Sequence, residues 1–159
     1  MRIAIVSDTH KSMSSIRKVC EKIEKENPDL ILHLGDVMED ADVMEAILGR
    51  EVRRVPGNCD YAYGMKHALF IQVEDIGIYA VHGHEQGVKR SLRPLAGEAA
   101  GKGAKIALYG HTHVAREENL GGVHLLNPGS AALPKNGQEK SMAFLKIRGK
   151  EFSFDIVPL

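Results

Sequence analysis

The amino-acid sequence predicts an α/β domain with either one mixed β-sheet or two packed sheets. In the first third of the chain, apolar runs alternate with helical patterns, which is typical of parallel strands joined by crossover helices. In the last third, turn residues recur at short intervals, which favours antiparallel strands. The chain has the length of one compact domain, and no repeat, linker or low-complexity segment divides it. We therefore expect residues 1–159 to form a single domain.

The first third predicts the order strand, helix, strand, helix, strand. The three apolar runs are residues 2–7, 29–35 and 51–55. A helix is expected over residues 14–25, where apolar residues recur at helical spacing and Pro28 follows. A second helix ends at Gly49, and its apolar face consists of Val43, Met44, Ile47 and Leu48. This order implies a parallel sheet with right-handed crossovers.

The second half predicts shorter elements. Residues 67–73 and 78–82 flank the sequence EDIG, which is a hairpin signal. A poorly formed helix is expected at residues 97–105, leading into the apolar run 106–110. Two further strands, expected to pair antiparallel across a Gly149-Lys150 turn, are residues 142–148 and 152–157.

Composition argues against several classes of protein. The chain has 21 basic and 21 acidic side chains, so it lacks the basic excess that is usual in proteins that bind duplex nucleic acid. No apolar run approaches the ~18 residues of a membrane span, and the N-terminus turns polar too early for a signal peptide. We expect a cytoplasmic protein that does not bind membranes. Cys20 lies on the apolar face of the first helix, so a disulfide with Cys59 is not expected.

Metal-binding side chains follow five of the predicted strands. In chain order they are Asp8 and His10, then Asp36, then Asn58, Cys59 and Asp60, then His82 and His84, and finally His111 and His113. Ligands of open α/β sheets gather at the carboxyl ends of the strands, so these groups are expected to converge on one rim. Each motif alone has an ordinary explanation, such as a helix cap or a turn. Their coincidence at five strand ends predicts a metal site, whereas we interpret His33, His67 and His124 as ordinary histidines.

The donor set indicates which metals would bind. Its seven strongest members are Asp8, His10, Asp36, Asn58, His82, His111 and His113. Four imidazoles favour Mn, Fe, Co, Ni or Zn over Ca or Mg, which prefer oxygen ligands. Seven donors exceed one tetrahedral zinc site but suffice for two ions if one carboxylate bridges them. Two divalent cations against two carboxylates leave about two positive charges, which suits a hydroxide and an anionic phosphate.

These residues resemble a known set of motifs. SDTH at Asp8, GD at Asp36, GNCD at Asn58, HGH at His82 and GHTH at His111 occur in the order found in the calcineurin-like metallophosphoesterase superfamily. The length and the NPGS sequence at residues 127–130 resemble its small single-domain branch, the YfcE-type phosphodiesterases. The resemblance runs from residue 3 to about residue 130. It implies two mixed sheets packed as a sandwich and flanked by helices, in four layers ordered αββα.

The resemblance also implies a role for each donor. The first metal would be held by Asp8, His10 and His113, and the second by Asn58, His82 and His111. Asp36 would bridge the two ions, and a bridging hydroxide would attack phosphorus in line. His84 would face the substrate without binding metal. The ions are expected to be Mn²⁺, with Ni²⁺, Co²⁺, Fe²⁺ and Zn²⁺ as alternatives.

One position departs from many monoesterases of the superfamily, which have histidine where this chain has Cys59. A thiol with a pKa near ~8.5 is a poorer proton donor than an imidazolium. Cysteine is common in the small diesterase branch, so the resemblance predicts hydrolysis of a small phosphodiester. Proton handling near the leaving oxygen would involve Asn58, Cys59, Asp60 and His84.

The sequence leaves other interpretations open. The retromer complex has a subunit of this fold that serves as a binding platform, and nucleases and monophosphatases share the motifs. The NPGS loop either supports the site or is a plain turn. Four basic residues either contact substrate or form a solvated face: Lys89, Arg90, Arg93 and Arg116. The sequence does not identify the natural substrate, and assembly into a homo-oligomer is possible.

Overall fold

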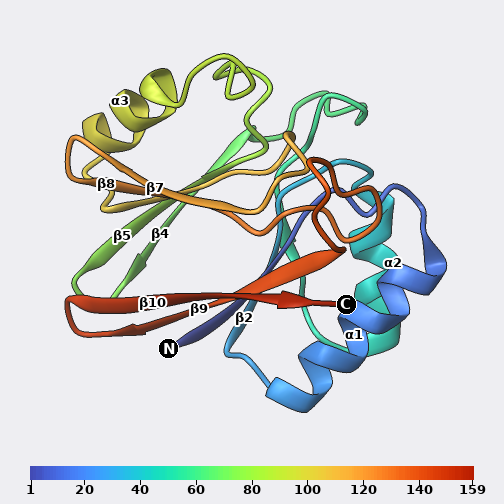
Figure 1. The fold of residues 1–159 in the computed structure, drawn as a ribbon. Helices are drawn as coiled ribbons and strands as arrows, with labels where there is room; N and C mark the ends of the chain where they lie inside the picture. The colour runs from blue at the N-terminus through green and yellow to red at the C-terminus, as the bar shows by residue number, and fades with distance from the viewer.

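In the computed structural model, which describes residues 1–159, two five-stranded sheets pack face to face with helices outside them (Figure 1). The first sheet has the order β10-β9-β1-β2-β3, formed by Glu151–Pro158, Ser141–Arg148, Arg2–Val6, Leu30–His33 and Arg53–Arg54. The second has the order β4-β5-β6-β8-β7, formed by Ala68–Val73, Ile76–Val81, Ile106–Leu108, Val123–Asn127 and Arg116–Leu120. The helices are α1 at Met13–Glu26, α2 at Glu39–Leu48 and α3 at Arg93–Gly101.

Both sheets are mixed. In the first, β1, β2 and β3 run parallel, whereas β9 is antiparallel to both β1 and β10. In the second, β5, β6 and β8 run parallel, and the edge strands β4 and β7 are antiparallel to their neighbours. The predicted parallel opening and the two predicted antiparallel hairpins, β4-β5 and β9-β10, are therefore confirmed. The sequence is compatible with one sheet or two, and the structure has two.

Three apolar clusters account for the layers. The largest contains 17 buried residues from the facing sides of both sheets, including Ile5 and Ile78. A second packs α1 and α2 against the outer side of the first sheet, and a third packs α3 against the second sheet (Figure 1). The predicted four-layer αββα arrangement is confirmed. None of the helices combines the length and the apolar character needed to cross a membrane.

Several boundaries differ from prediction. The buried face of α2 is turned toward Asp40 and Ala41, and predicted core residue Ile47 is 42% exposed. Helix α3 starts four residues earlier than expected, because Pro94 fits the first turn of a helix. Strand β3 has two residues rather than five, since the backbone N–H of Val52 donates to the Glu45 side chain at 2.8 Å. The turn residues Gly121-Gly122 do fall between two short antiparallel strands, β7 and β8, as the recurring turn pattern predicts.

A buried polar chain connects β2, the loop after β1 and α2. The backbone N–H of Gly35 donates to His33 Nδ1 at 3.1 Å, so the proton of the neutral imidazole lies on Nε2. That nitrogen donates to Thr9 Oγ1 at 3.0 Å, and the Thr9 hydroxyl donates to Asp40 Oδ2 at 2.5 Å. His33 is fully buried, and this burial lowers its pKa to about 4. These hydrogen bonds hold the loop that carries Asp8 in place.

The burial of His33 in this hydrogen-bonded series predicts a loss of stability in acid. The pKa of His33 lies below that of free histidine, so between pH 6.5 and 4 the unfolded chain binds the proton that the folded chain excludes. The free energy of unfolding should fall by about 3 kcal/mol from this group as the pH drops through that window. Urea denaturation of metal-free protein measures it. In His33→Gln the free energy of unfolding should depend less on pH than in the wild type, and in His124→Gln the dependence should stay as it is in the wild type. An equal pH dependence in all three proteins would contradict the prediction.

The close approach of the two sheets predicts the effect of a methyl group at Gly110. A Cβ there would lie 2.0 Å from Ser7 Oγ and 2.8 Å from Asp8 Oδ2. Gly110→Ala should therefore cost about 1–3 kcal/mol of stability through overpacking. In α3, a Cβ at Gly97 would meet nothing within 4 Å, so Gly97→Ala should add about 0.5–1 kcal/mol. The denaturation midpoints of Gly110→Ala and Gly97→Ala measure the difference. Similar stabilities of the two variants would contradict the close approach of Gly110 to Ser7 and Asp8.

Candidate metal centre

The predicted donors lie at one edge that the two sheets share. Strands β1, β2 and β3 of the first sheet end there, and so do β5 and β6 of the second. Backbone hydrogen bonds fix the loops at this edge: the N–H of Asp8 donates to Gly35 O at 2.7 Å, and the N–H of Gly110 donates to His82 O at 2.9 Å. The expected rim of one sheet is thus the common rim of two.

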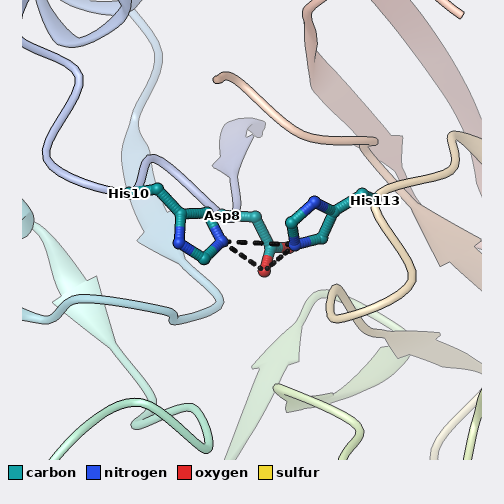
Figure 2. A group of neighbouring side chains, drawn as sticks. All are labelled: Asp8, His10 and His113. Carbon is teal, nitrogen blue, oxygen red and sulfur yellow. Dashed lines mark hydrogen bonds and ion pairs between the residues drawn. The ribbon is translucent and has the colours of Figure 1, made fainter. Parts of the chain in front are cut away.

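Three of the donors form a first group, shown in Figure 2. Asp8 Oδ1 lies 3.2 Å from His113 Nε2 and 3.8 Å from His10 Nε2. The two imidazole nitrogens are 3.2 Å apart and face the same carboxylate. These are the three residues that the resemblance assigns to one metal.

A second group lies beside the first and consists of Asp8, Asp36 and His82. His82 Nε2 lies 3.6 Å from Asp36 Oδ1, 4.0 Å from Asp8 Oδ1 and 3.2 Å from Asn58 Oδ1. The ring of His111 is next to it, with its centroid 5.0 Å from that of His82. The carboxylate common to both groups is Asp8, so the bridging role of Asp36 stays a prediction.

The hydrogen bonds of the two buried imidazoles aim their free nitrogens at this carboxylate. His82 Nδ1 lies 2.6 Å from Leu34 O, and His113 Nδ1 lies 2.7 Å from Leu133 O. A carbonyl can only accept, so each Nδ1 carries a proton and each ring turns its Nε2 toward the carboxylate. Second partners of this kind commonly orient histidine ligands of metals.

Asp8 itself has one oxygen without a hydrogen-bond partner. Its Oδ2 accepts from the Ser7 hydroxyl at 2.6 Å and from the His111 N–H at 3.1 Å. Its Oδ1 is buried, has no hydrogen bond, and faces the Nε2 atoms of the three neighbouring imidazoles. A buried carboxylate oxygen without a hydrogen bond and the three imidazole nitrogens that face it together form a donor set for a cation. The residues present therefore fit divalent metal ions.

The charges of the site follow from this arrangement. Burial opposes ionisation of Asp8, but the contacts with His10 and His113 outweigh it and hold the pKa of Asp8 well below its usual range. The Asp8 carboxylate in turn raises the pKa of His10. His111 differs, because burial, the neighbouring His82 and the Lys89 ammonium lower its pKa to about 4. Near pH 7 His111 is therefore a neutral donor.

Backbone strain marks the same residues. Asp8, His10, His111 and His113 all have positive φ angles, between 44° and 65°. L-residues rarely adopt this conformation, and such strain concentrates at functional sites. The two motifs, SDTH and GHTH, thus bend sharply just where their strands end. Sequence alone does not reveal the strain.

The turn after β3 holds Cys59 close to Asp36. Asp60 accepts from the N–H of Met38 at 2.7 Å and from the N–H of Gly57 at 2.8 Å, so both of its oxygens bind backbone. The N–H of Cys59 donates to Asp36 Oδ1 at 3.0 Å. The Asp36 carboxylate raises the pKa of the exposed Cys59 thiol. Cys20 is buried and free, so the expected absence of a disulfide is confirmed.

His84 lies at the outer side of the second group. Its ring centroid is 5.4 Å from that of His82 and 6.1 Å from that of His111. Burial and the proximity of His82 lower its pKa. Its Nε2 lies 3.8 Å from Glu85, which also pairs with His67 at 2.6 Å. His84 is therefore a partly exposed neutral imidazole beside the centre.

The NPGS loop contacts the backbone of both histidine and aspartate motifs. The Asn127 amide donates to Gly110 O at 3.0 Å and to Thr112 Oγ1 at 3.1 Å. The Ser130 hydroxyl donates to Asp8 O at 2.8 Å. Of the two roles that the sequence leaves open for this loop, these contacts favour support of the site. The contacts of Thr9 with His33 and Asp40 are not predictable from sequence, because these partners lie 24 and 31 residues away along the chain.

The chain is similar to curated phosphoesterases over most of its length. It is 32% identical to the probable metallophosphoesterase YsnB of Bacillus subtilis, over 92% of this chain and 85% of that protein. It is 26% identical to the phosphodiesterase YfcE of Escherichia coli, over 91% and 87% of the two chains.

Solved structures show the same likeness. A predicted phosphoesterase from Streptococcus pneumoniae superposes with a TM-score of 0.83 at 28% identity, over 99% of this chain and 88% of that one. Vps29 from Entamoeba histolytica, solved with Zn²⁺, shares the fold at 22% identity with a TM-score of 0.80, over 99% and 98%. The calcineurin-like phosphoesterase superfamily domain matches residues 1–150. The chain therefore belongs to the calcineurin-like phosphoesterase superfamily.

Proposed function

We propose that this protein is a phosphodiesterase that depends on two divalent metal ions. The observation that carries the proposal is the buried Oδ1 of Asp8, which has no hydrogen bond while the Nε2 atoms of His10, His82 and His113 face it. A hydrogen-bonded structural aspartate would have its lone pairs satisfied. The name of YfcE supports diester chemistry as the reaction.

The ions would be held as the resemblance implies, the first by Asp8, His10 and His113, and the second by Asn58, His82 and His111, with Asp36 between them. Bound there, divalent ions supply Lewis acidity toward water and toward the non-bridging phosphate oxygens. We propose Mn²⁺ as the preferred ion, because imidazole and carboxylate ligands together suit it.

The residues around the centre would handle the leaving group. His84 presents a neutral imidazole toward the centre and would position the phosphate or its leaving oxygen. The Cys59 thiol, with its raised pKa, keeps its proton near pH 7 and is a weak donor. Asp60 would act by holding the turn, since both of its oxygens bind backbone N–H groups. This set suits leaving groups that depart without a proton, as in activated diesters.

The alternatives receive less support. A binding platform does not require a complete donor set, whereas all seven positions carry donors here. A nuclease would need basic surface for a duplex, and the chain has no net charge.

Metal removal tests the proposal directly. Chelated protein should lose hydrolysis of bis(p-nitrophenyl) phosphate, because the donors alone cannot acidify water. Mn²⁺ or Ni²⁺ should restore the rate better than Mg²⁺ or Ca²⁺, which prefer oxygen ligands. Elemental analysis beside the rate assay should find two ions per chain. Undiminished turnover in fully stripped protein would refute the dependence on metal.

Variants at two positions test the proton-handling roles. Cys59→Ser should change the rate on an activated diester less than about threefold, since the thiol is a weak acid there. His84→Ala should lower it by about 10²-fold, the usual range for a positioned acid–base group. Cys59→His should improve alkyl monoesters more than activated diesters. Metal content is measured for each variant, so that lost ions are separated from lost chemistry. An inactive but fully metallated Cys59→Ser would reverse the assignment.

A further inference from the structure

A cavity of about 350 Å³ opens beside the GHTH motif. Three segments that are distant in sequence contribute to its wall. They supply Val88 and Lys89 after the HGH motif, four residues in and around GHTH (Tyr109, Thr112, Val114 and Arg116), and Lys135 and Asn136. Thr112 lies in this wall and stands between the two histidines of GHTH. The cavity therefore adjoins the candidate metal centre.

The charge of this cavity is uneven for a chain with no net charge. Its wall includes Lys89, Arg116 and Lys135 and contains no carboxylate. Four other cavities, of about 260 to 680 Å³, each include at least one acidic residue. Arg116 pairs with Glu118 at 2.6 Å outside this wall. Counting that pair as neutral leaves two positive charges, those of Lys89 and Lys135.

Neutral donors accompany these cations. The Tyr109 phenol lies in the wall and is a neutral hydroxyl that can donate a hydrogen bond. The Asn136 amide is a further donor in the wall. Ammonium groups with neutral donors and no carboxylate are the chemistry that binds phosphate.

The cavity is also fixed relative to the centre. The N–H of Lys135 donates to His113 O at 3.0 Å, which ties one wall segment to a predicted metal ligand. The sequence does not distinguish Arg90 and Arg93 from Lys89 and Arg116, and all four are exposed. Only Lys89 and Arg116 line this cavity.

We propose that this cavity binds a second phosphate group of the substrate, with Lys89 and Lys135 as its principal contacts. The preferred substrates are then phosphodiesters that carry a further phosphate near the scissile one. This inference rests on the proposed function, because it takes hydrolysis to occur at the adjacent metal centre. It assigns substrate selection to residues outside the predicted metal ligands.

A matched pair of substrates tests the inference. Thymidine 5′-(p-nitrophenyl phosphate) is compared with the same compound carrying a 3′-phosphate, using Mn²⁺-loaded protein. The 3′-phosphate should lower KM about tenfold in the wild type, the size of one charge-assisted hydrogen bond. Lys89→Ala and Lys135→Ala should each raise KM about tenfold for the 3′-phosphorylated substrate, and change it less than about twofold for the other. Arg90→Ala, the matched control, should leave both KM values unchanged.

Two kinetic outcomes would overturn the inference. Equal KM values for the two substrates in the wild type would show that the cavity does not engage the phosphate. An equal effect of Lys89→Ala on both substrates would show general steering or a structural defect. If neither compound is hydrolysed, the proposed function fails instead.

Binding to metal-free protein, measured by calorimetry, then decides the inference alone. Thymidine 3′,5′-bisphosphate should bind about tenfold tighter than thymidine 5′-phosphate to the wild type, with the difference lost in Lys89→Ala and kept in Arg90→Ala. Equal affinities of wild type and Lys89→Ala for the bisphosphate would overturn it.

Discussion

The buried carboxylate of Asp8 is the constraint on which the arrangement of the edge depends. A carboxylate taken out of water costs several kcal/mol unless positive charge and hydrogen bonds surround it. Ser7 and the backbone of His111 satisfy one oxygen, and three imidazoles face the other. Because those imidazoles come from both sheets, a cation that pairs with this oxygen can be held only when the two sheets meet as they do. Fold and site are therefore coupled through a single side chain.

Local patterns in the sequence predict some of these features, whereas contacts between distant residues are not predictable. Polar groups that follow apolar strands form local patterns, so the sequence alone places Asp8 and His111 at strand ends. Helix α1 is equally predictable, because its apolar residues recur at helical spacing. The buried face of α2 is not, since Asp40 turns inward to accept from Thr9, a partner 31 residues away. Short-range patterns predict elements well, and they miss polar pairs that form only after folding.

The limits are similar within the site. That His10 and His113 would hold one metal together with Asp8 follows from the resemblance, whereas the strained backbone angles of the two histidines appear only in three dimensions. Asp60 shows that a sequence neighbour need not have the predicted role. Its position next to Cys59 makes it a candidate for proton handling, but both of its oxygens accept hydrogen bonds from backbone N–H groups. Proximity in sequence indicates which residues share a turn. It does not indicate which of them faces the reacting phosphate.

Charge placement connects the centre to the choice of substrate. With two divalent ions bound, the predicted donor set would carry about two positive charges, because its two carboxylates neutralise half of the charge of the ions. Those charges attract any phosphate ester, so they cannot distinguish one diester from another. Discrimination needs charge or shape outside the ligands, fixed at a set position relative to them. Lys135 meets this requirement, because its backbone is hydrogen-bonded to His113 while the residue lines the cavity beside GHTH. Selectivity would then follow from the loop that also orients a predicted metal ligand, His113.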